Sequence, residues 1–482
     1  MKTRLVASIF LCLVTVCQAQ AQDANYWQAN YGPGGYLTPG AVVAYDNNQG
    51  FFYVNPALMA INPKTSVSLS ANVYQADLLT IKDGVGSGKN LQGISFKINP
   101  QMISGTIAFK ENRTIALGYA LLHNPVLNYQ TTQRQDKQMP VLADSYSPGD
   151  EYYVGQYAAH NRISQTTAAG AIGVKLSSRW SIGLTAEGQI RTQDFYEQYS
   201  SRALVNTPDA SVLFPPLINV ESSYQAVYWH VGLRIKGGIS YDAGAHHIGL
   251  VLSSPMLSLK GRAVVTSDLV VSNLHVPDTS IETNLLANGR QTNLPVTYKM
   301  PLSIAAGYAV DFEKLQLYLA GEYFLTVPAY NLITPGSGSF IRPDTGSNRL
   351  ETTELLQLKE SRKGVLNVAV GSRYFINPAV SLIGSLRTDF SYNTEDKTGE
   401  YKGQVPNINR WNNYHAQLGG TFKRRKFNLR AGLLLTYGQT ATYQQPVNFD
   451  NPTESSLMLG EVKPVKASFF STGLLLAYIH NL

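Results

Sequence analysis

The feature that most constrains the fold is an alternation of apolar and polar residues that recurs along the chain. Residues 179–191 read RWSIGLTAEGQIR, in which Trp180 and Ile182 belong to the apolar set while Thr185 and Glu187 belong to the polar set. Successive side chains of a β-strand point to opposite faces, so this stretch is predicted to be a strand with one apolar and one polar side. The apolar side faces either a second sheet in a soluble sandwich or lipid in a membrane barrel.

The same alternation predicts fourteen strands, and an even number is typical of bacterial single-chain membrane barrels. A bend at Asn99-Pro100 is expected within the second of them. The predicted strands lie near residues 65–76, 90–110, 113–124, 162–176, 179–194, 224–241, 246–253, 299–310, 314–325, 364–376, 379–392, 411–422, 427–438 and 467–481.

The connections between these strands alternate between tight and long. Tight turns are predicted around Glu111-Asn112, Ser177-Ser178, Ala243-Gly244, Phe312-Glu313, Asn377-Pro378 and Arg424-Arg425. Long connections are predicted over 77–89, 125–161, 195–223, 254–298, 326–363, 393–410 and 439–466. Membrane barrels have short periplasmic turns and long external loops, whereas long structureless loops are rare in compact soluble domains. We therefore expect an all-β, transmembrane antiparallel β-barrel over residues 65–482, with some strands projecting beyond the membrane on the outer side.

The N-terminus has the layout of a cleaved signal peptide over residues 1–22. Lys2 and Arg4 precede an apolar stretch, and small residues follow it. Cys12 and Cys17 are the two cysteines of the chain, so disulfides and thiolate metal sites are not expected after cleavage. Removing the two signal cations lowers the formal net charge from +7 to +5, which does not suggest a nucleic-acid partner. The expected location is the outer membrane of a Gram-negative cell.

Residues 23–64 do not follow the strand pattern, and we predict that they form an N-terminal hatch or plug inside the lumen. A loose tail is the alternative. The segment contains Tyr26, Trp27, Phe51 and Phe52, and disordered segments are poor in such aromatic residues. This composition favours the hatch.

Residues 40–60, GAVVAYDNNQGFFYVNPALMA, the strand VSLSANVYQ and the stretch QMISGTIAF at 101–109 resemble the outer-membrane long-chain fatty acid and aromatic hydrocarbon transporters. The resemblance implies a passive route for small hydrophobic molecules. They would be captured by external loops, pass a pocket above the hatch and leave through a sideways gap at a kink in the third strand. The hatch residues would be Asn55, Pro56, Ala57, Phe51 and Phe52. Pro125 is interpreted as the end of the third strand, so this portal stays unassigned.

Alternation places ten polar or charged side chains on the lumen side. These are Glu187, Gln189, Arg191, His230, Arg234, Arg373, Arg387, Asp389, His415 and Arg430. We expect Arg234, Arg387, Glu187 and His230 to contact the ligand, because an arginine at mid-depth binds a carboxylate through paired hydrogen bonds. The alternative is that opposite charges simply neutralise one another across a polar lumen.

Catalytic and cofactor motifs are weak in this sequence. GVGSGKN at 84–90 departs from a phosphate-binding loop at Asp83 and Asn90 and lies between two strands. A GxSxG motif is absent, and eight scattered histidines predict no metal cluster. We therefore expect no enzyme activity, no cofactor and no bound metal.

Three functional hypotheses follow. The leading one is a passive transporter for small hydrophobic compounds, either long-chain fatty acids or aromatic hydrocarbons. The second is a barrel that serves as a binding or adapter component of a protein secretion system, which requires a protein partner. The third is an enzyme such as a lipid hydrolase. The expected partners of a transporter are a hydrophobic small molecule and outer-membrane lipid, and the barrel is expected to be monomeric.

Overall fold

The computed structural model describes residues 24–27, 42–45, 53–61, 63–109, 114–207, 214–275, 282–343, 352–393 and 411–482. The predicted signal peptide, Phe51, Phe52 and the predicted turn at 111–112 lie outside these residues.

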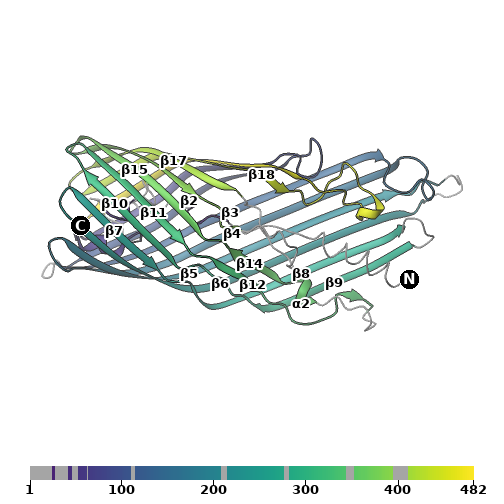
Figure 1. The fold of residues 1–482 in the computed structure, drawn as a ribbon, viewed down its shortest axis with the longest axis horizontal. Coiled ribbons are helices and arrows are strands. Elements are labelled where there is room, and N and C mark those ends of the chain that lie inside the picture. The colour runs from purple at the N-terminus through teal and green to yellow at the C-terminus, as the bar shows by residue number, and fades with distance from the viewer. Residues whose placement is uncertain are drawn as a thin grey trace.

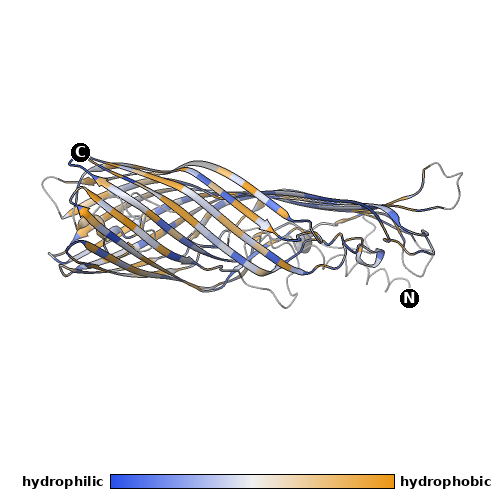
Figure 2. Ribbon diagram, turned by 90° about the horizontal axis from the view of Figure 1, so that it is seen from above, coloured by the Kyte–Doolittle hydropathy of each residue, from blue (hydrophilic) through white to orange (hydrophobic). Residues whose placement is uncertain are grey.

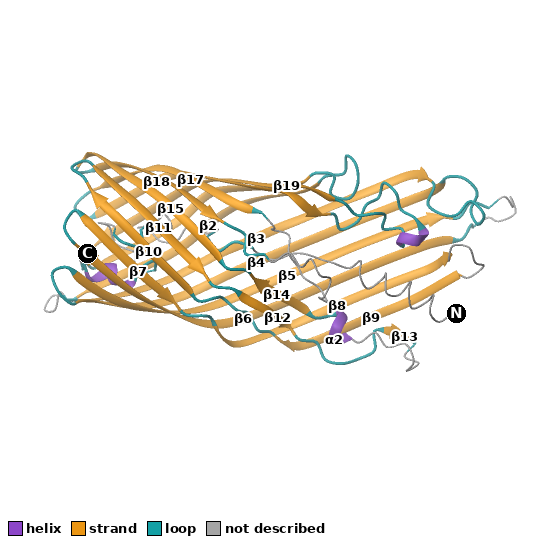
Figure 3. Cartoon of the chain, viewed as in Figure 1, coloured by secondary structure: helices purple, strands orange, loops and turns teal. Residues whose placement is uncertain are grey.

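Almost all regular structure in the described part of the chain is β-strand (Figure 3). The barrel strands are β1 (Ser66–Ile81), β2 (Leu91–Ala108), β3 (Ile115–Met139), β4 (Glu151–Lys175), β5 (Trp180–Leu204), β6 (Leu217–Asp242), β7 (His246–Ser253), β10 (Ser303–Asp311), β11 (Leu315–Phe324), β15 (Val365–Asn377), β16 (Val380–Asp389), β17 (Asn412–Lys423), β18 (Phe427–Gln444) and β19 (Pro464–Asn481). The remaining elements are β8 (Leu257–His275), β9 (Glu282–Pro295), β12 (Val327–Ile333), β13 (Ile341–Arg342), β14 (Leu358–Arg362), α2 (Thr352–Leu355) and the 3₁₀ helices η1 (Pro56–Ala60) and η2 (Glu454–Ser456). No helix in the described ranges is long and apolar enough to cross a membrane.

Fourteen of the described strands close a barrel by antiparallel pairing (Figure 1). Each pairs with the next barrel strand along the chain, and β19 returns to pair with β1 from Ser66↔Asn481 to Ile81↔Ala467. Closure pairs every barrel strand on both sides over at least part of its length. The fourteen strands coincide with the fourteen predicted from alternation, and five of the six predicted tight turns lie in the described residues and are present.

Several predicted long loops are strands instead. β3 and β4 continue their ladder over 125–139 and 151–161, and β5 and β6 continue theirs over 195–204 and 217–223. The predicted loop 254–298 contains the hairpin of β8 and β9. β8 pairs with the outer part of β6, beyond the point where β6 pairs with β7. These strands form an extension of the barrel wall, which projects to the right in Figure 1. The predicted loops were wrong because each strand was ended where its apolar–polar alternation stopped, whereas backbone pairing continues beyond that point.

The interpretation of Pro125 as the end of the third strand was also wrong. β3 pairs with β4 through Pro125↔Ser164 and then Leu127↔Ile163, so Val126 is an extra residue in a β-bulge. A bulge absorbs a proline and reverses which residues face inward. After the bulge, the outward positions of β3 are all polar, and they are Asn128, Gln130, Thr132, Arg134, Asp136 and Gln138.

The outer face of β5 changes polarity partway along the strand, although the ladder with β4 has no register shift. From Trp180 to Ile190 the exposed alternate residues are apolar, whereas Thr192 and the following alternate residues to Arg202 are mostly polar. Figure 2 shows the same contrast between an apolar barrel and a more hydrophilic extension. The eleven residues from Trp180 to Ile190 match the roughly 9–11 residues that a tilted strand needs to cross a bilayer. The outer end of the membrane-spanning part of β5 therefore lies between Ile190 and Thr192.

The inner side of the extension is an apolar core. Phe195 and Tyr224 on the strands pack with residues of the connecting segments, including Leu356, Trp411 and Phe449. Here water lies outside and apolar side chains lie inside, the reverse of the membrane part. The extension is thus folded like a water-soluble sheet covered on one face.

The Gly-rich stretch at 84–90 binds the carboxylate of Asp450 from the same chain. The backbone N–H and the hydroxyl of Ser87 both donate to Asp450 Oδ2 at 2.7 Å, and the Gly88 N–H donates to Asp83 Oδ1 at 2.7 Å. Burial acts to raise the pKa of Asp450, but the hydrogen bonds from Ser87 outweigh it and hold the pKa below its ordinary value. The loop therefore ties the β1–β2 connection to the β18–β19 connection.

The ladder between β2 and β3 is shorter than the ladders on either side. It runs from Met102↔Leu122 to Ala108↔Ala116, whereas β2 stays paired with β1 as far as Leu91. Between residues 91–101 of β2 and 123–139 of β3, all within the described ranges, no backbone ladder forms. Near the outer end, Gln133 Nε2 donates to the Asn90 carbonyl at 3.1 Å. Along this seam the two strands are joined by side-chain contacts such as this one and not by a backbone ladder.

Candidate functional site

Three described N-terminal segments, residues 24–27, 42–45 and 53–61, lie against the inner wall of the barrel. The η1 helix in the third segment contacts β3, β4, β5 and β6. Asn55 accepts a hydrogen bond from the Ala57 N–H through Oδ1 at 3.0 Å and donates through Nδ2 to the carbonyl of Val43 at 2.8 Å. Asn55 therefore caps η1 and joins it to residues 42–45.

The Asn-Pro-Ala sequence by itself does not distinguish this site. At the turn before β16, Asn377 Oδ1 accepts hydrogen bonds from the N–H groups of Ala379 and Val380 at 2.9 Å, which is the same local cap. What differs is the donor side, because Asn55 Nδ2 also lies 3.3 Å from the carbonyl of Ile239 on β6. The tertiary contacts give Asn55 its special position.

Inward-facing glycines allow the N-terminal segments to approach the wall. Gly173, Gly183 and Gly238 are cross-strand neighbours on β4, β5 and β6. A Cβ at Gly183 would lie 2.4 Å from the carbonyl carbon of Pro56, and one at Gly238 would lie 2.1 Å from Asn55 Oδ1. Glycine in a strand often marks a close approach of another backbone. We call these three residues the glycine row.

A second pair of glycines admits residues 42–45. A Cβ at Gly249 on β7 would lie 2.1 Å from the Val43 carbonyl oxygen, and one at Gly307 on β10 would lie 2.8 Å from Val43 Cβ. The ring of Tyr45 also stacks on His247 at a centroid distance of 3.6 Å. This part of the segment is therefore packed against the periplasmic ends of β7 and β10.

Residues 24–27 dock higher in the lumen. The Trp27 N–H donates to Asp389 Oδ1 at 2.9 Å, and its indole Nε1–H donates to Glu322 Oε2 at 2.8 Å. Tyr26 stacks on Phe324 with ring centroids 3.9 Å apart. Two carboxylates of the wall thus hold the indole and backbone of Trp27.

A cavity of about 180 Å³ lies between these segments and the wall. Its lining includes Glu187, Arg234 and Arg387, three of the four residues predicted to contact a ligand. Apolar and aromatic side chains share the lining, among them Tyr26, Trp27, Tyr53, Val54, Met256, Met300 and Phe324. The cavity lining is therefore mixed, with aromatic and methionine side chains beside the charged groups of Glu187, Arg234, Lys236, Glu322 and Arg387.

His230 is not among the described lining residues of this cavity. Its side chain is buried, and Nε2 lies 2.6 Å from the Ser258 hydroxyl. Its ring centroid is 5.8 Å from that of Tyr298. Direct contact between His230 and a molecule in this cavity is therefore not supported by the geometry.

The charged lining groups are engaged with the protein. Glu187 lies opposite Arg234 in the ladder, yet its ion pair is with Lys236, at 2.6 Å between Nζ and Oε1. Arg234 donates from Nε to the Ser254 carbonyl and from a terminal NH₂ to the Ser303 hydroxyl, both at 3.0 Å. For Glu187, the alternative that opposite charges in the lumen neutralise one another therefore applies, and the partner is Lys236.

Lys236 links the wall to the N-terminal segment and was missed at the sequence level. Its Nζ lies 4.1 Å from the ring centroid of Tyr53 and donates to the Tyr53 carbonyl at 3.3 Å. Alternation showed that Lys236 faces the lumen with Arg234, but no local signal marks the contact with Tyr53. One cation therefore joins Glu187 of the wall to the segment that follows Phe52.

A stack of arginine and tyrosine side chains packs against residues 24–27. The guanidinium of Arg362 on β14 lies 4.5 Å from the ring centroid of Tyr392 and 5.6 Å from that of Tyr26. Arg362 is fully buried, and Nε donates to Glu360 Oε1 at 2.8 Å. Arg362 could not be found from alternation, because β14 lies in a predicted loop.

Candidate metal ligands do not cluster in the described part of the chain. Within these ranges no group of three or more His, Cys, Asp or Glu side chains could hold a metal ion. The arrangement can instead enclose a small apolar molecule between aromatic and methionine side chains.

Comparisons with known proteins agree on the fold. No protein-family model and no curated protein sequence matches the chain. The crystal structure of a Pseudomonas aeruginosa FadL homologue aligns with a TM-score of 0.56 at 12% identity, covering 96% of this chain and 100% of that one. The Pseudomonas putida toluene transporter TodX aligns with a TM-score of 0.54 at 12% identity, with coverages of 96% and 100%. The Ralstonia pickettii toluene transporter TbuX aligns with a TM-score of 0.53 at 12% identity, with coverages of 94% and 99%.

Proposed function

We propose that this protein is a passive transporter for small hydrophobic compounds in the outer membrane of a Gram-negative cell. The observation that carries the proposal is the lumen cavity between the N-terminal segments and the wall, where aromatic and methionine side chains can enclose a small apolar molecule. The likeness in fold to two toluene transporters and a FadL homologue supports it. The adapter hypothesis has no comparable structural support.

The N-terminal segments act as the hatch in this proposal. The contacts at the glycine row, the Asn55 cap and the Lys236 bridge hold them against the wall. Phe51 and Phe52, also predicted for the hatch, lie outside the described residues. A molecule that enters from outside must move these segments, or pass beside them, to continue.

A lateral exit is consistent with the seam between β2 and β3. Backbone pairing stops beyond Leu122, and Pro125 provides no N–H for a ladder. A hydrophobic molecule leaving at the inner end of this seam, near Leu122 and Pro125, would reach lipid at the outer boundary of the membrane without crossing the periplasmic end. The portal implied by the family resemblance is thereby assigned, as a proposal, to this seam.

The cavity favours a compact ligand. Its volume of about 180 Å³ is below the roughly 300–1,000 Å³ typical of pockets for drug-sized ligands. A monoaromatic hydrocarbon fits such a space more readily than a long-chain acid bound along its length. Arg387 lines the cavity and is the candidate partner for a carboxylate.

Uptake by whole cells tests the proposal. Labelled toluene and labelled oleate are offered to bacteria that lack their own outer-membrane hydrophobic permease, with and without this protein. We expect faster toluene uptake with the protein. If oleate is also carried, Arg387→Gln should slow oleate alone, because only oleate has a carboxylate for the guanidinium.

Arg373→Gln is the matched control, because Arg373 also faces inward but binds Ser381 near the periplasmic turn. Heat-dependent mobility on gels shows whether each barrel is folded. No uptake of either compound by a folded barrel in the outer membrane contradicts the transport proposal and directs attention to a protein partner.

A further inference from the structure

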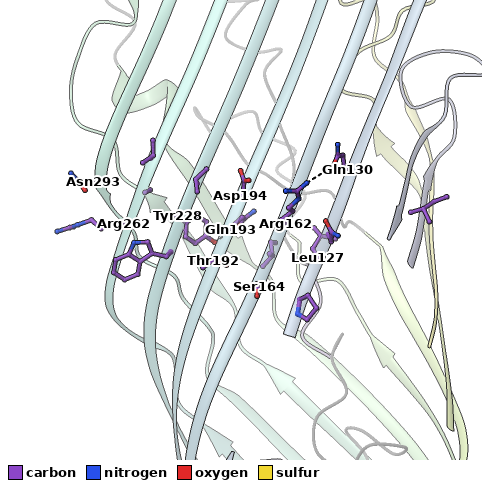
Figure 4. A pocket seen from close by; sticks show the side chains of 18 residues that line it. Leu127, Gln130, Arg162, Ser164, Thr192, Gln193, Asp194, Tyr228, Arg262 and Asn293 are labelled. Carbon is purple, nitrogen blue, oxygen red and sulfur yellow. Dashed lines mark hydrogen bonds between the residues drawn. The ribbon is translucent and has the colours of Figure 1, made fainter. Parts of the chain in front are cut away.

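An open groove of about 800 Å³ crosses the outer face of the wall at the base of the extension. Figure 4 shows its side chains in a band across neighbouring strands, with Arg162, Ser164, Thr192 and Arg262 among them. Thr192 and Ile190 share the outward face of β5, so the groove is separate from the lumen cavity.

Bulges in the sheet produce this groove. The extra residue Val126 interrupts β3, and register shifts occur between Val231 and Gly232 in the β6–β8 ladder and between Ala263 and Val265 in the β8–β9 ladder. Each bulge bends its strand and increases the local twist. The bulged ladders border the groove on both sides, whereas the β4–β5 and β5–β6 ladders between them have no register shift.

The groove lies where the outer face changes from apolar to polar. Its floor contains Thr192 and Asp194, the first polar outward residues after Ile190 on β5. Trp229, another lining residue, is 38% exposed, and tryptophan is enriched at the membrane–water interface. The groove is therefore at the height of the lipid headgroups of the outer leaflet.

Two arginines lie at different positions along the groove. Arg162 on β4 donates to Gln130 Oε1 at 3.2 Å and stays exposed. Arg262 on β8 is exposed, and its side chain makes no hydrogen bond or ion pair with any described residue. Three strand spacings separate β4 from β8, which is roughly 14 Å. The acidic Asp194 between them is paired with His160, at 3.2 Å between Nε2 and Oδ1.

We propose that this groove binds the phosphorylated sugar headgroup of an outer-leaflet glycolipid. Arg162 and Arg262 each hold a phosphate, since guanidinium groups bind phosphate with paired hydrogen bonds. Asn128 on β3 and Asn293 on β9 offer hydrogen bonds to sugar hydroxyls from the two ends of the groove, while Ile94 and Pro125, at the β3 end, contact acyl chains. Basic pockets at headgroup height are a recognised form of lipid site. The site fixes the height of the barrel and lies beside the seam, independently of what the lumen carries.

Binding of bisphosphorylated lipid A to the full-length protein in detergent micelles tests the proposal, with native mass spectrometry as the readout. We expect Arg162→Ala and Arg262→Ala to weaken binding by about tenfold each, because each removes a charge-assisted hydrogen-bond pair. Dephosphorylated lipid A should bind the unchanged protein as weakly as bisphosphorylated lipid A binds the double variant.

Arg134→Ala is the matched control, because Arg134 faces outward on β3 beyond the groove and pairs with Asp136. It should leave binding unchanged. Equal binding to the folded single variants and the unchanged protein overturns the proposal. Equal binding of phosphatidylglycerol and lipid A also overturns it, because it would show a site for any anionic lipid without sugar recognition. If the double variant fails to fold, the comparison of phosphorylated with dephosphorylated lipid A on the unchanged protein still decides, since equal binding of the two overturns the proposal.

Discussion

The two halves of β5 share one backbone geometry and one ladder with β4 but have opposite polarity. Below Ile190, the outward side chains are apolar and the inward ones include Ser181, Thr185 and Glu187. Above Thr192, the outward side chains are mostly polar and the inward ones include Phe195. Since the strand does not shift register, the surroundings must change, from lipid outside and a polar lumen inside to water outside and an apolar core inside.

The difference teaches that alternation shows which residues share a face but not which face is buried. In the membrane part, the exposed outer face is apolar because it contacts lipid, so exposed residues are not the polar ones. In the extension, exposed residues are mostly polar and buried residues are mostly apolar, as in a soluble protein. β3 also runs from the membrane part into the extension, but it has a bulge at Val126 that reverses its faces. β5 has no bulge, and only the polarity of its residues changes.

The largest expected effect comes from deleting Val126. Without this extra residue, the inward and outward faces of β3 are exchanged beyond Pro125. Asn128, Gln130 and Arg134 would turn inward, and the inward Tyr129 would turn outward. Burying each unpaired polar group costs about 1–3 kcal/mol, so the total is on the order of 5–10 kcal/mol. We expect the extension to unfold while the membrane barrel persists, measured by protease cleavage within residues 127–139.

Val126→Ala is the control for this deletion, because it keeps the extra residue and therefore the bulge. It should remain as resistant to protease as the unchanged protein. A deletion variant that resists protease equally well would show that the reversal of faces does not stabilise the extension.

The next effect concerns the polar lumen, where Gly183→Val should displace η1. The added Cβ would lie 2.4 Å from the Pro56 carbonyl carbon, so the helix cannot stay in place. We expect the ion conductance of single barrels in a planar bilayer to rise, with deletion of residues 23–60 setting the upper limit.

Gly237→Val is the matched variant on β6, since a Cβ there meets nothing within 4 Å. It should conduct like the unchanged protein. Unchanged conductance in both the Gly183 variant and the deletion would refute the hatch.

A smaller, pH-dependent effect is expected from Glu197 in the extension, where an ionisable group faces an apolar interior. Burial raises the pKa of Glu197 to about 7, although the Tyr157 hydroxyl donates to Oε1 at 2.7 Å and acts to lower it. The folded state then binds more protons than the unfolded state between the ordinary carboxyl pKa and about 7. Stability of the extension should therefore fall as pH rises through this window, by on the order of 3 kcal/mol.

Hydrogen exchange of β4 and β5 amides at pH 5 and pH 8 measures this effect. Glu197→Gln should remove most of the difference, because the amide does not ionise. Glu221→Gln is the control, since Glu221 faces outward and pairs with Arg202 at 3.5 Å. An unchanged difference in the Glu197 variant would show that the pH dependence arises elsewhere.

The sequence predicted the barrel well because its determinant is local. Each membrane strand shows its own alternation, and tight turns mark the periplasmic ends. The extension was missed because Pro125 was interpreted as the end of the third strand and because the apolar–polar alternation of the membrane strands stops where the extension begins. Pairing energy from neighbouring strands overrides such a local signal.

The candidate site was predicted in part. The inward positions of Glu187, Arg234 and Arg387 follow from alternation, and the cavity gathers them. The partners do not follow, because Lys236 meets Tyr53 and Trp27 meets Glu322 across 183 and 295 residues of chain. Such contacts depend on how the N-terminal segments enter the closed barrel, which no local pattern encodes.

The most direct test of the change of surroundings along β5 is a single-cysteine scan of its outward face. Cys12 and Cys17, the two cysteines of the chain, both lie in the predicted signal peptide, so each introduced thiol would be unique. Intact cells are treated with a membrane-impermeant maleimide. We expect cysteines at Gln198 and Arg202 to be labelled. Cysteines at the outward positions from Ile182 to Ile190 should be protected from the maleimide. Labelling at Ile182 or Ile190 as rapid as at Gln198 would contradict a lipid boundary between Ile190 and Thr192.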